Sequence, residues 1–302
     1  MQLSNLSSSR WLRKNIGAVL LGLVLLVPVA AVGDTVPYRH FTVRDGLPHA
    51  SVLSLDQGPN GQLWIGTASG LAVYDGHSIR SVELPDSLGT RRVPEVVARP
   101  SGTTCAVLGS EALVCLRRGS VERIVPLPNI PNAPARLLTR GDSLLMVMRS
   151  SLWVIPSRSA PVQKHPYDYP ITTGAPTHVD SSTGFGAVDA ALSPDGSLWV
   201  LDGWRGLGRL SLDGSVRFLD APLSRSPGSR WSSLRLRPEG SAILSGGHKT
   251  IRVNHPTGHR TLLFDEGYSE IHLTPNGFYG ARRNRVAQWT PNGTTFFGPA
   301  QG

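Results

Sequence analysis

Apolar and polar positions alternate along most of the chain in short runs between turns. Leu63 and Ile65, or Ile271 and Leu273, are pairs of apolar residues separated by one position. A period of two is typical of strands, and the Gly, Pro, Asn and Asp residues that punctuate the runs are typical of tight turns. The pattern predicts an all-β protein built from many short strands.

Two stretches, residues 52–76 and 188–214, have the same order of parts. Each has an apolar strand, a Pro-Asn-Gly or Pro-Asp-Gly turn, a Leu-Trp pair, a glycine-bearing loop, a second strand and an Asp-Gly turn. Weaker copies complete a series of six turn glycines, namely Gly61, Gly102, Gly141, Gly196, Gly240 and Gly277. Their mean separation is about 43 residues, which is typical of four-stranded propeller blades. We interpret each as the positive-φ residue of a hairpin turn.

The repeats predict a β-propeller of four-stranded antiparallel blades over residues 34–302. Six blades are expected near residues 50–85, 92–127, 134–165, 186–220, 231–264 and 269–298. Tyr38–Val43 and Thr294–Gly298 both resemble the outermost strand of a blade. Because one blade has a single outermost strand, two alternatives stay open: a truncated seven-bladed ring, or a ring that closes imperfectly at six.

The first 33 residues have the pattern of an export signal. Arg10, Arg13 and Lys14 precede an apolar run over residues 16–32, and Ala31 and Gly33 suit cleavage by a signal peptidase. The alternative is an uncleaved signal anchor, since the apolar helix is nearly long enough to span a bilayer. Both alternatives predict a periplasmic or extracytoplasmic propeller, attached to the membrane only if the anchor is retained.

Two cysteines lie on strands that we expect to be neighbours, Thr104–Leu108 and Ala112–Leu116. Pairing Leu108 with Ala112 places Cys105 opposite Cys115, within reach of a disulfide, and an exported protein meets an oxidising compartment. Two buried thiols that act as small apolar residues are the alternative.

Three stretches carry a resemblance to a known family. They are Phe41-Thr-Val-Arg-Asp-Gly46-Leu-Pro48, Gly61-Gln-Leu-Trp64-Ile-Gly-Thr67 and Gly70-Leu-Ala-Val-Tyr-Asp-Gly76. They resemble the two-component regulator propeller repeats of bacterial sensor ectodomains, specifically over residues 38–80 and more loosely over 187–219. The resemblance implies a propeller that senses a small-molecule or oligosaccharide ligand for a downstream kinase or regulator module.

The net charge and the sequence motifs limit the functions that we expect of this chain. The formal net charge is +9, and three of the positive charges lie in the export signal, so nucleic-acid binding is not implied. Nucleophile-elbow, phosphate-loop, Cys-x-x-Cys and zinc-protease motifs do not occur, so we predict no enzyme activity, cofactor or metal. A propeller enzyme of the lyase or lactonase type, or an envelope protein-interaction scaffold, are the alternative functions.

Aromatic and basic residues suggest where a ligand binds. We expect Trp64, Trp199 and an equivalently placed Trp153 to pack between blades. The loops that join second to third strands emerge on one face, where converging guanidinium groups favour an anionic ligand. The candidate ligand-binding residues on these loops are Arg149, Trp204, Arg205, His248, Lys249, Arg282 and Arg283.

Overall fold

The computed structural model describes residues 39–127, 135–156, 160–168, 186–203, 205–219, 231–247, 249–254, 259–282 and 285–297. For Arg282 and Arg285 the backbone alone is described. The export signal that the sequence predicts lies outside these residues. Within them, no helix is long and apolar enough to cross a bilayer.

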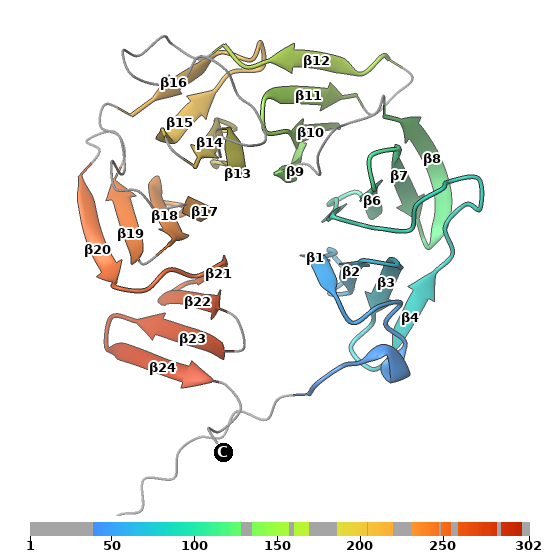
Figure 1. Ribbon diagram of the computed structural model, residues 1–302, viewed down its shortest axis with the longest axis horizontal. Coiled ribbons are helices and arrows are strands. Elements are labelled where there is room, and N and C mark those ends of the chain that lie inside the picture. Colours follow the sequence, from blue (N-terminus) through green and yellow to red (C-terminus); the bar gives the residue numbers. More distant parts are fainter. Residues whose placement is uncertain are drawn as a thin grey trace, which may run out of the picture. The chain divides into compact units, whose positions relative to one another are not determined.

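Six antiparallel four-stranded sheets lie around a central axis as the blades of a propeller (Figure 1). In every blade the strands pair in sequence order, the first innermost and the fourth outermost. The all-β, six-bladed architecture predicted from the repeats is therefore confirmed.

The strands of the first three blades have these bounds: β1 (Val52–Gln57), β2 (Leu63–Thr67), β3 (Gly70–Tyr74) and β4 (Ile79–Val82) in blade 1; β5 (Glu95–Ala98), β6 (Thr103–Leu108), β7 (Ala112–Arg117) and β8 (Ser120–Pro126) in blade 2; β9 (Arg136–Arg140), β10 (Ser143–Val147), β11 (Ser151–Ile155) and β12 (Gln163–Pro166) in blade 3.

The strands of the last three blades have these bounds: β13 (Ala187–Leu192), β14 (Leu198–Asp202), β15 (Gly206–Leu210) and β16 (Val216–Phe218) in blade 4; β17 (Trp231–Leu236), β18 (Ser241–Gly246), β19 (Lys249–Asn254) and β20 (Arg260–Phe264) in blade 5; β21 (Glu270–Thr274), β22 (Gly277–Arg282), β23 (Arg285–Thr290) and β24 (Gly293–Phe297) in blade 6.

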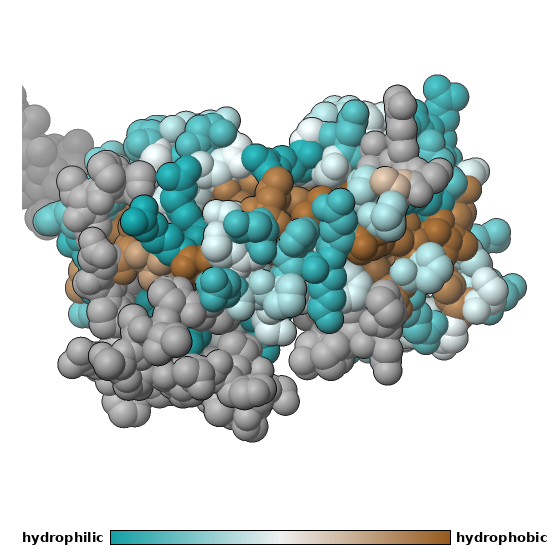
Figure 2. Space-filling view, turned by 90° about the horizontal axis from the view of Figure 1, so that it is seen from above, coloured by the Kyte–Doolittle hydropathy of each residue, from teal (hydrophilic) through white to brown (hydrophobic). Residues whose placement is uncertain are grey.

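The hydrophobic core is divided among the junctions between successive blades. Trp64 packs between blades 1 and 2, Trp153 between blades 2 and 3, and Trp199 between blades 4 and 5, as predicted. Trp153 is not equivalent to the other two, however, because it lies on the third strand of its blade and they lie on the second. In an edge-on view, hydrophilic residues cover much of the visible surface and apolar side chains lie between them (Figure 2).

Cys105 and Cys115 form the disulfide that the sequence permits. The register of β6 and β7 is also as predicted, with Leu108 opposite Ala112 and Cys105 opposite Cys115. Both cysteines are buried and belong to the core between blades 2 and 3. The alternative of two free thiols is therefore wrong.

The turn glycines differ at one position from the prediction. Gly61, Gly102, Gly141, Gly196 and Gly240 have positive φ, whereas Gly277 does not. A Cβ atom at Gly277 would instead lie 1.8 Å from the carbonyl oxygen of Trp289, a backbone atom that cannot give way. Glycine is required there because the neighbouring strand approaches so closely, not because of its backbone angle.

The predicted outer strand at Tyr38–Val43 is wrong in its described part. Residues 39–42 have no regular structure, and Val43–Asp45 form a single 3-10 turn, η1. The Thr42 backbone N–H and hydroxyl both donate to the Asp45 carboxylate, at 2.7 and 2.9 Å, and Gly46 ends the turn at φ 109°. This turn directs Phe41 and Leu47 onto the free face of blade 1, against Ile65.

The junctions between blades are not all alike. Each innermost strand contacts the next from β1 through β5, β9, β13 and β17 to β21. Among the described residues, β21 and β1 do not contact each other as extensively as the other pairs of neighbouring innermost strands do. Within the described part of the chain, the innermost strands are therefore continuous through five junctions, and the junction between blades 6 and 1 is the weakest of the six.

Candidate ligand-binding site

The innermost strand of each blade carries one or more charged residues, and six of these make up what we call the channel belt. Its members are Asp56, Glu95, Arg136, Asp189, Arg235 and Glu270, on β1, β5, β9, β13, β17 and β21 respectively. Because these strands surround the axis (Figure 1), the belt brings together four acids and two arginines from all six blades.

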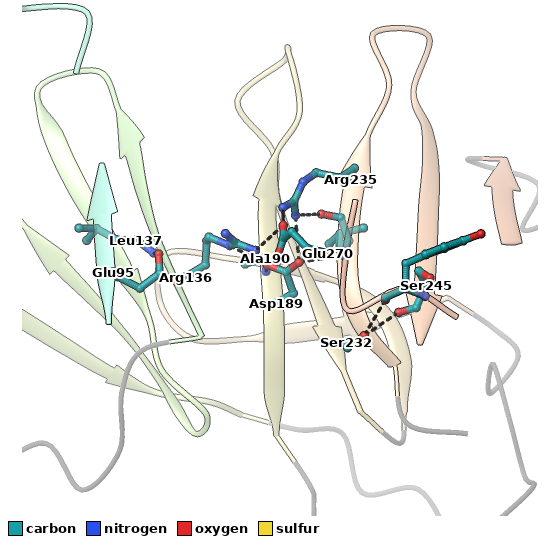
Figure 3. Close-up of polar contacts among 11 residues, drawn as sticks. Glu95, Arg136, Leu137, Asp189, Ala190, Ser232, Arg235, Ser245 and Glu270 are labelled. Atoms are coloured by element: carbon teal, nitrogen blue, oxygen red, sulfur yellow. Dashed lines mark hydrogen bonds and ion pairs between the residues drawn. The ribbon is translucent and has the colours of Figure 1, made fainter. Parts of the chain in front are cut away.

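Asp189 is the best-connected member of the channel belt (Figure 3). Its carboxylate is fully buried and accepts from Arg136 Nε at 2.8 Å and from Arg235 Nη1 at 3.1 Å. The backbone N–H groups of Ala190 and Leu234 donate to it as well, at 2.8 and 2.7 Å. Four donors from blades 3, 4 and 5 thus neutralise one buried carboxylate.

Arg235 extends this network to blade 6 through an ion pair with Glu270, and Arg136 Nη2 lies 3.9 Å from the same carboxylate. The two arginines therefore each lie between two acids. A buried charge is tolerated only where such partners compensate for its lost hydration.

Other acids of the channel belt bond to the backbone of the following blade. Asp56 of blade 1 accepts from the Ala98 N–H of blade 2 at 2.7 Å, and Glu95 of blade 2 accepts from the Leu137 N–H of blade 3 at 3.4 Å. Burial raises the pKa of Asp56. It also raises the pKa of Glu95, to about 7, although Arg136 and the Leu137 N–H oppose the shift.

Sequence reasoning did not find the channel belt. The signal is a single charge in an otherwise apolar or small run on the innermost strand of a blade, as in Val188-Asp189-Ala190. Its partners come from strands tens of residues away, so the pairing itself is invisible in the sequence. Since the belt's arginines and Asp189 bond to each other, its main effect is to hold neighbouring blades together.

Three of the predicted basic residues are described with their side chains, and they lie on one rim of the propeller. Arg149 is in the β10–β11 turn, Arg205 directly precedes β15, and Lys249 begins β19 after the β18–β19 turn. These are the turns between second and third strands of blades 3, 4 and 5, and we call this edge the basic rim. Of the other candidates, Trp204, His248 and Arg283 lie outside the described residues, as does the side chain of Arg282.

The described residues of the basic rim differ in their surroundings. The Arg205 side chain is 10% exposed and its Nη1 lies 3.5 Å from the fully buried carboxylate of Asp202. Asp202 also accepts from the backbone N–H of Arg205 at 2.8 Å. Lys249 Nζ lies 6.0 Å from the centre of the Trp231 ring. Arg205 is thus held against its own turn, whereas Lys249 lies over an aromatic face.

A cleft of about 540 Å³ lies on the same edge of the ring, between blade 1 and the segment that connects it to blade 2. Pro48, Gly70 and Leu84 line it together with Arg91. Arg91 bonds to Asp86 at 2.6 Å and to the Leu84 carbonyl at 2.7 Å, so its guanidinium is engaged within the wall.

Comparison with known proteins identifies the repeat in this first blade. Residues 46–69, which run from the end of η1 through β2, match the family described as two component regulator propeller. Blade 1 therefore contains a repeat similar to those of the two-component regulator propeller family. A stretch of 69 residues is 38% identical to histidine kinase P4 of Formosa agariphila, covering 22% of this chain and 5% of that protein.

Solved structures share the β-propeller fold of this chain. Virginiamycin B lyase from Staphylococcus aureus superimposes with a TM-score of 0.66 at 14% identity, over 83% of this chain and 85% of the lyase. The extracellular domain of a putative hybrid two component system from B. thetaiotaomicron gives a TM-score of 0.64 at 18% identity, over 88% of this chain and 37% of that domain. Identities this low show a common fold alone.

Proposed function

We propose that this propeller is the extracytoplasmic sensing domain of a two-component-type signalling protein, and that it binds its ligand without chemically changing it. The regulator propeller match in blade 1 is the observation that carries the proposal. The similarity of 69 residues to a histidine kinase supports attachment to a kinase or regulator module. The Cys105–Cys115 disulfide supports an oxidising compartment outside the cytoplasm.

The absence of chemical turnover is proposed from the way the charged groups of the channel are used. Arg136 and Arg235 both pair with Asp189, so the charges of these three residues stabilise the ring. A general acid or base needs a proton-transferring group within reach of a substrate atom. Glu95, the channel acid with the pKa raised to about 7, bonds to the Leu137 backbone.

We further propose that the ligand is an anionic small molecule or oligosaccharide bound on the basic rim. Arg149, Arg205 and Lys249 lie on the corresponding turns of three consecutive blades. The sequence prediction adds Trp204, His248, Arg282 and Arg283, which lie outside the described side chains, to this candidate set. Guanidinium groups bind carboxylate and sulfate through paired hydrogen bonds, and the Trp204 ring offers a stacking face.

Isothermal titration calorimetry on the whole chain tests the ligand class. Oligogalacturonate and a heparin-derived tetrasaccharide serve as acidic probes, and maltohexaose serves as the neutral one. We expect at least one acidic probe to bind without being cleaved, as judged by mass spectrometry, and the neutral one to bind at least tenfold more weakly. Cleavage of a probe would show an enzyme instead.

A double substitution on the basic rim tests where the acidic probe binds. Arg149→Gln combined with Lys249→Gln should weaken binding of the acidic probe at least tenfold. Arg80→Gln, which removes an exposed arginine from an ion pair with Asp75 in blade 1, is the matched control and should leave binding unchanged. Equal binding by the double variant and the wild type would remove the basic rim from the proposal.

A further inference from the structure

A cleft of about 510 Å³ lies between blades 2 and 3. The β5–β6, β7–β8 and β9–β10 turns form its entrance, where Ser101, Arg117 and Asp142 lie. Successive turns of an antiparallel meander alternate between its two ends, so this cleft opens on the edge opposite the basic rim. Its volume is in the range of small-molecule sites in proteins.

The floor of the cleft is apolar. Leu113, Leu144 and Ile155 are at most 3% exposed, and the disulfide-bonded Cys115 and Pro156 adjoin them. These residues also belong to or border the core between the two blades, so the floor is held rigid. Such a surface accepts the ring or chain of an organic molecule.

Two arginines bridge the blades across this cleft. Arg99 Nη2 of blade 2 donates to the Gly141 carbonyl of blade 3 at 3.2 Å, and Arg123 Nη1 donates to the Pro156 carbonyl at 2.5 Å. A guanidinium has five N–H donors, and among the described residues these are the hydrogen bonds that each group makes. Arg99 Nε is buried and has no hydrogen-bond partner in the described part of the chain.

The charge of the lining is positive overall. Arg117, whose side chain is 53% exposed, lies 3.2 Å from Glu122. With Arg99 and Arg123 there are three arginines in the wall, against the carboxylates of Glu122 and Asp142. An anion in the cleft would therefore accept hydrogen bonds from arginine N–H groups that have no partner among the described residues. It would also balance the excess positive charge of the cleft lining.

We propose that this cleft binds a small organic anion. Its carboxylate, sulfate or phosphate group is held by Arg99, Arg117 and Arg123, and its ring or chain lies on Leu113, Leu144 and Ile155. The site does not depend on the sensing function proposed above, because it lies on the opposite edge of the propeller and uses none of the same residues.

Calorimetric titration of the whole chain with matched aryl anions tests the proposal. Benzoate, phenyl sulfate and phenyl phosphate differ in their anionic group, while benzyl alcohol has the ring without the charge and inorganic sulfate has the charge without the ring. We expect at least one aryl anion to bind, and both partial probes to bind at least tenfold more weakly. If none of the three aryl anions binds, the proposal is wrong.

Three variants locate the bound anion. Arg117→Gln with Arg123→Gln should weaken binding at least tenfold, while Arg80→Gln, an exposed arginine on blade 1, should not change it. Ser101→Phe places a bulky ring at the entrance, removes no charge and should also abolish binding. Since Ser101 is exposed, this variant should keep the melting temperature of the wild type.

The same titration separates this proposal from the previous one. Arg149→Gln with Lys249→Gln should leave the aryl anion bound with unchanged affinity. Loss of binding in that variant, or retained binding in both Ser101→Phe and the Arg117/Arg123 variant, would overturn the assignment to the cleft between blades 2 and 3.

Discussion

At the scale of single residues, Asp189 shows how a charge can stabilise a propeller from its channel. The carboxylate is fully buried, and two arginines from blades 3 and 5 meet it on opposite sides. The nitrogen–oxygen distances of these two ion pairs are short, and two backbone N–H groups donate the remaining hydrogen bonds to the carboxylate. Removing the acid would leave two guanidinium groups facing each other without the charge between them.

Asp189→Asn should therefore lower the free energy of unfolding strongly. Breaking a buried pair by removing one partner costs about 3–5 kcal/mol, because the remaining charges stay buried. Urea unfolding followed by circular dichroism measures the change. Asp86→Asn is the control, since its side chain is 99% exposed and pairs with Arg91, and a surface pair contributes at most about 1 kcal/mol. Similar losses in the two variants would contradict the assignment.

Glu95 gives the pH dependence of stability a definite sign. Burial raises the pKa of its carboxyl from 4.5 to about 7, so the folded state holds this proton more tightly than the unfolded state does. The free energy of unfolding should then fall as the pH rises from about 4.5 to about 7, and this group should contribute no further change above that range.

Glu95→Gln should flatten this part of the profile. The difference between variant and wild type should grow by about 3 kcal/mol across the window, because the pKa rises from 4.5 to about 7 and each pKa unit corresponds to about 1.4 kcal/mol. Urea unfolding at half-unit steps from pH 4.5 to 8 measures it. Parallel profiles for the two proteins would show that Glu95 titrates normally in the folded state.

At the scale of elements, the sequence was most informative where local chemistry decides the structure. The Pro-Asn-Gly and Pro-Asp-Gly turns located the hairpins, and the β6–β7 register followed from one pairing of Leu108 with Ala112. Local pattern failed at Phe41–Val43, because the alternation of apolar and polar residues there is overridden by the Thr42–Asp45 hydrogen bonds and by packing on blade 1. Local pattern also could not reveal the channel belt, because its residues are far apart in the sequence and are brought together only when the blades assemble into a ring.

The disulfide of blade 2 should stabilise that blade through its unfolded state. Cys105 and Cys115 are ten residues apart, and closing a loop of this size lowers the entropy of the unfolded chain by an amount worth about 3 kcal/mol. Replacing both cysteines with Ser, or reducing the wild type with dithiothreitol, should lower the denaturation midpoint. An unchanged midpoint after complete reduction, confirmed by thiol titration, would show that the bond adds no stability.

At the scale of the whole molecule, the ring has two kinds of blade. In blades 2 and 5 the second strands, β6 and β18, are buried along their whole length, because each sheet packs between two neighbours. In blade 6, Tyr279 and Val286 are 37% and 38% exposed on the face that has no packed neighbour among the described residues. On blade 1 the corresponding face is partly covered by Leu47, which is 6% exposed.

Hydrogen exchange should distinguish the two kinds of blade. The strands β18 and β22 are both second strands with ladder hydrogen bonds on each side, so any difference in exchange reports how well their sheet faces are packed. We expect amides of β22 to exchange about tenfold faster than those of β18, as measured by mass spectrometry of matched peptides, which corresponds to a local stability lower by about 1.4 kcal/mol.

Leu47 provides an internal test of the same argument. If coverage of the free face sets the exchange rate, Leu47→Ala should speed exchange of β2 in blade 1 and leave β18 unchanged, because the lost contacts are with Ile65 and its neighbours alone. Val43→Ala is the matched control, since that side chain is 55% exposed and contributes little packing. Equal exchange of β2 in both variants would mean that the strand ladder, and not the cover of the face, protects blade 1.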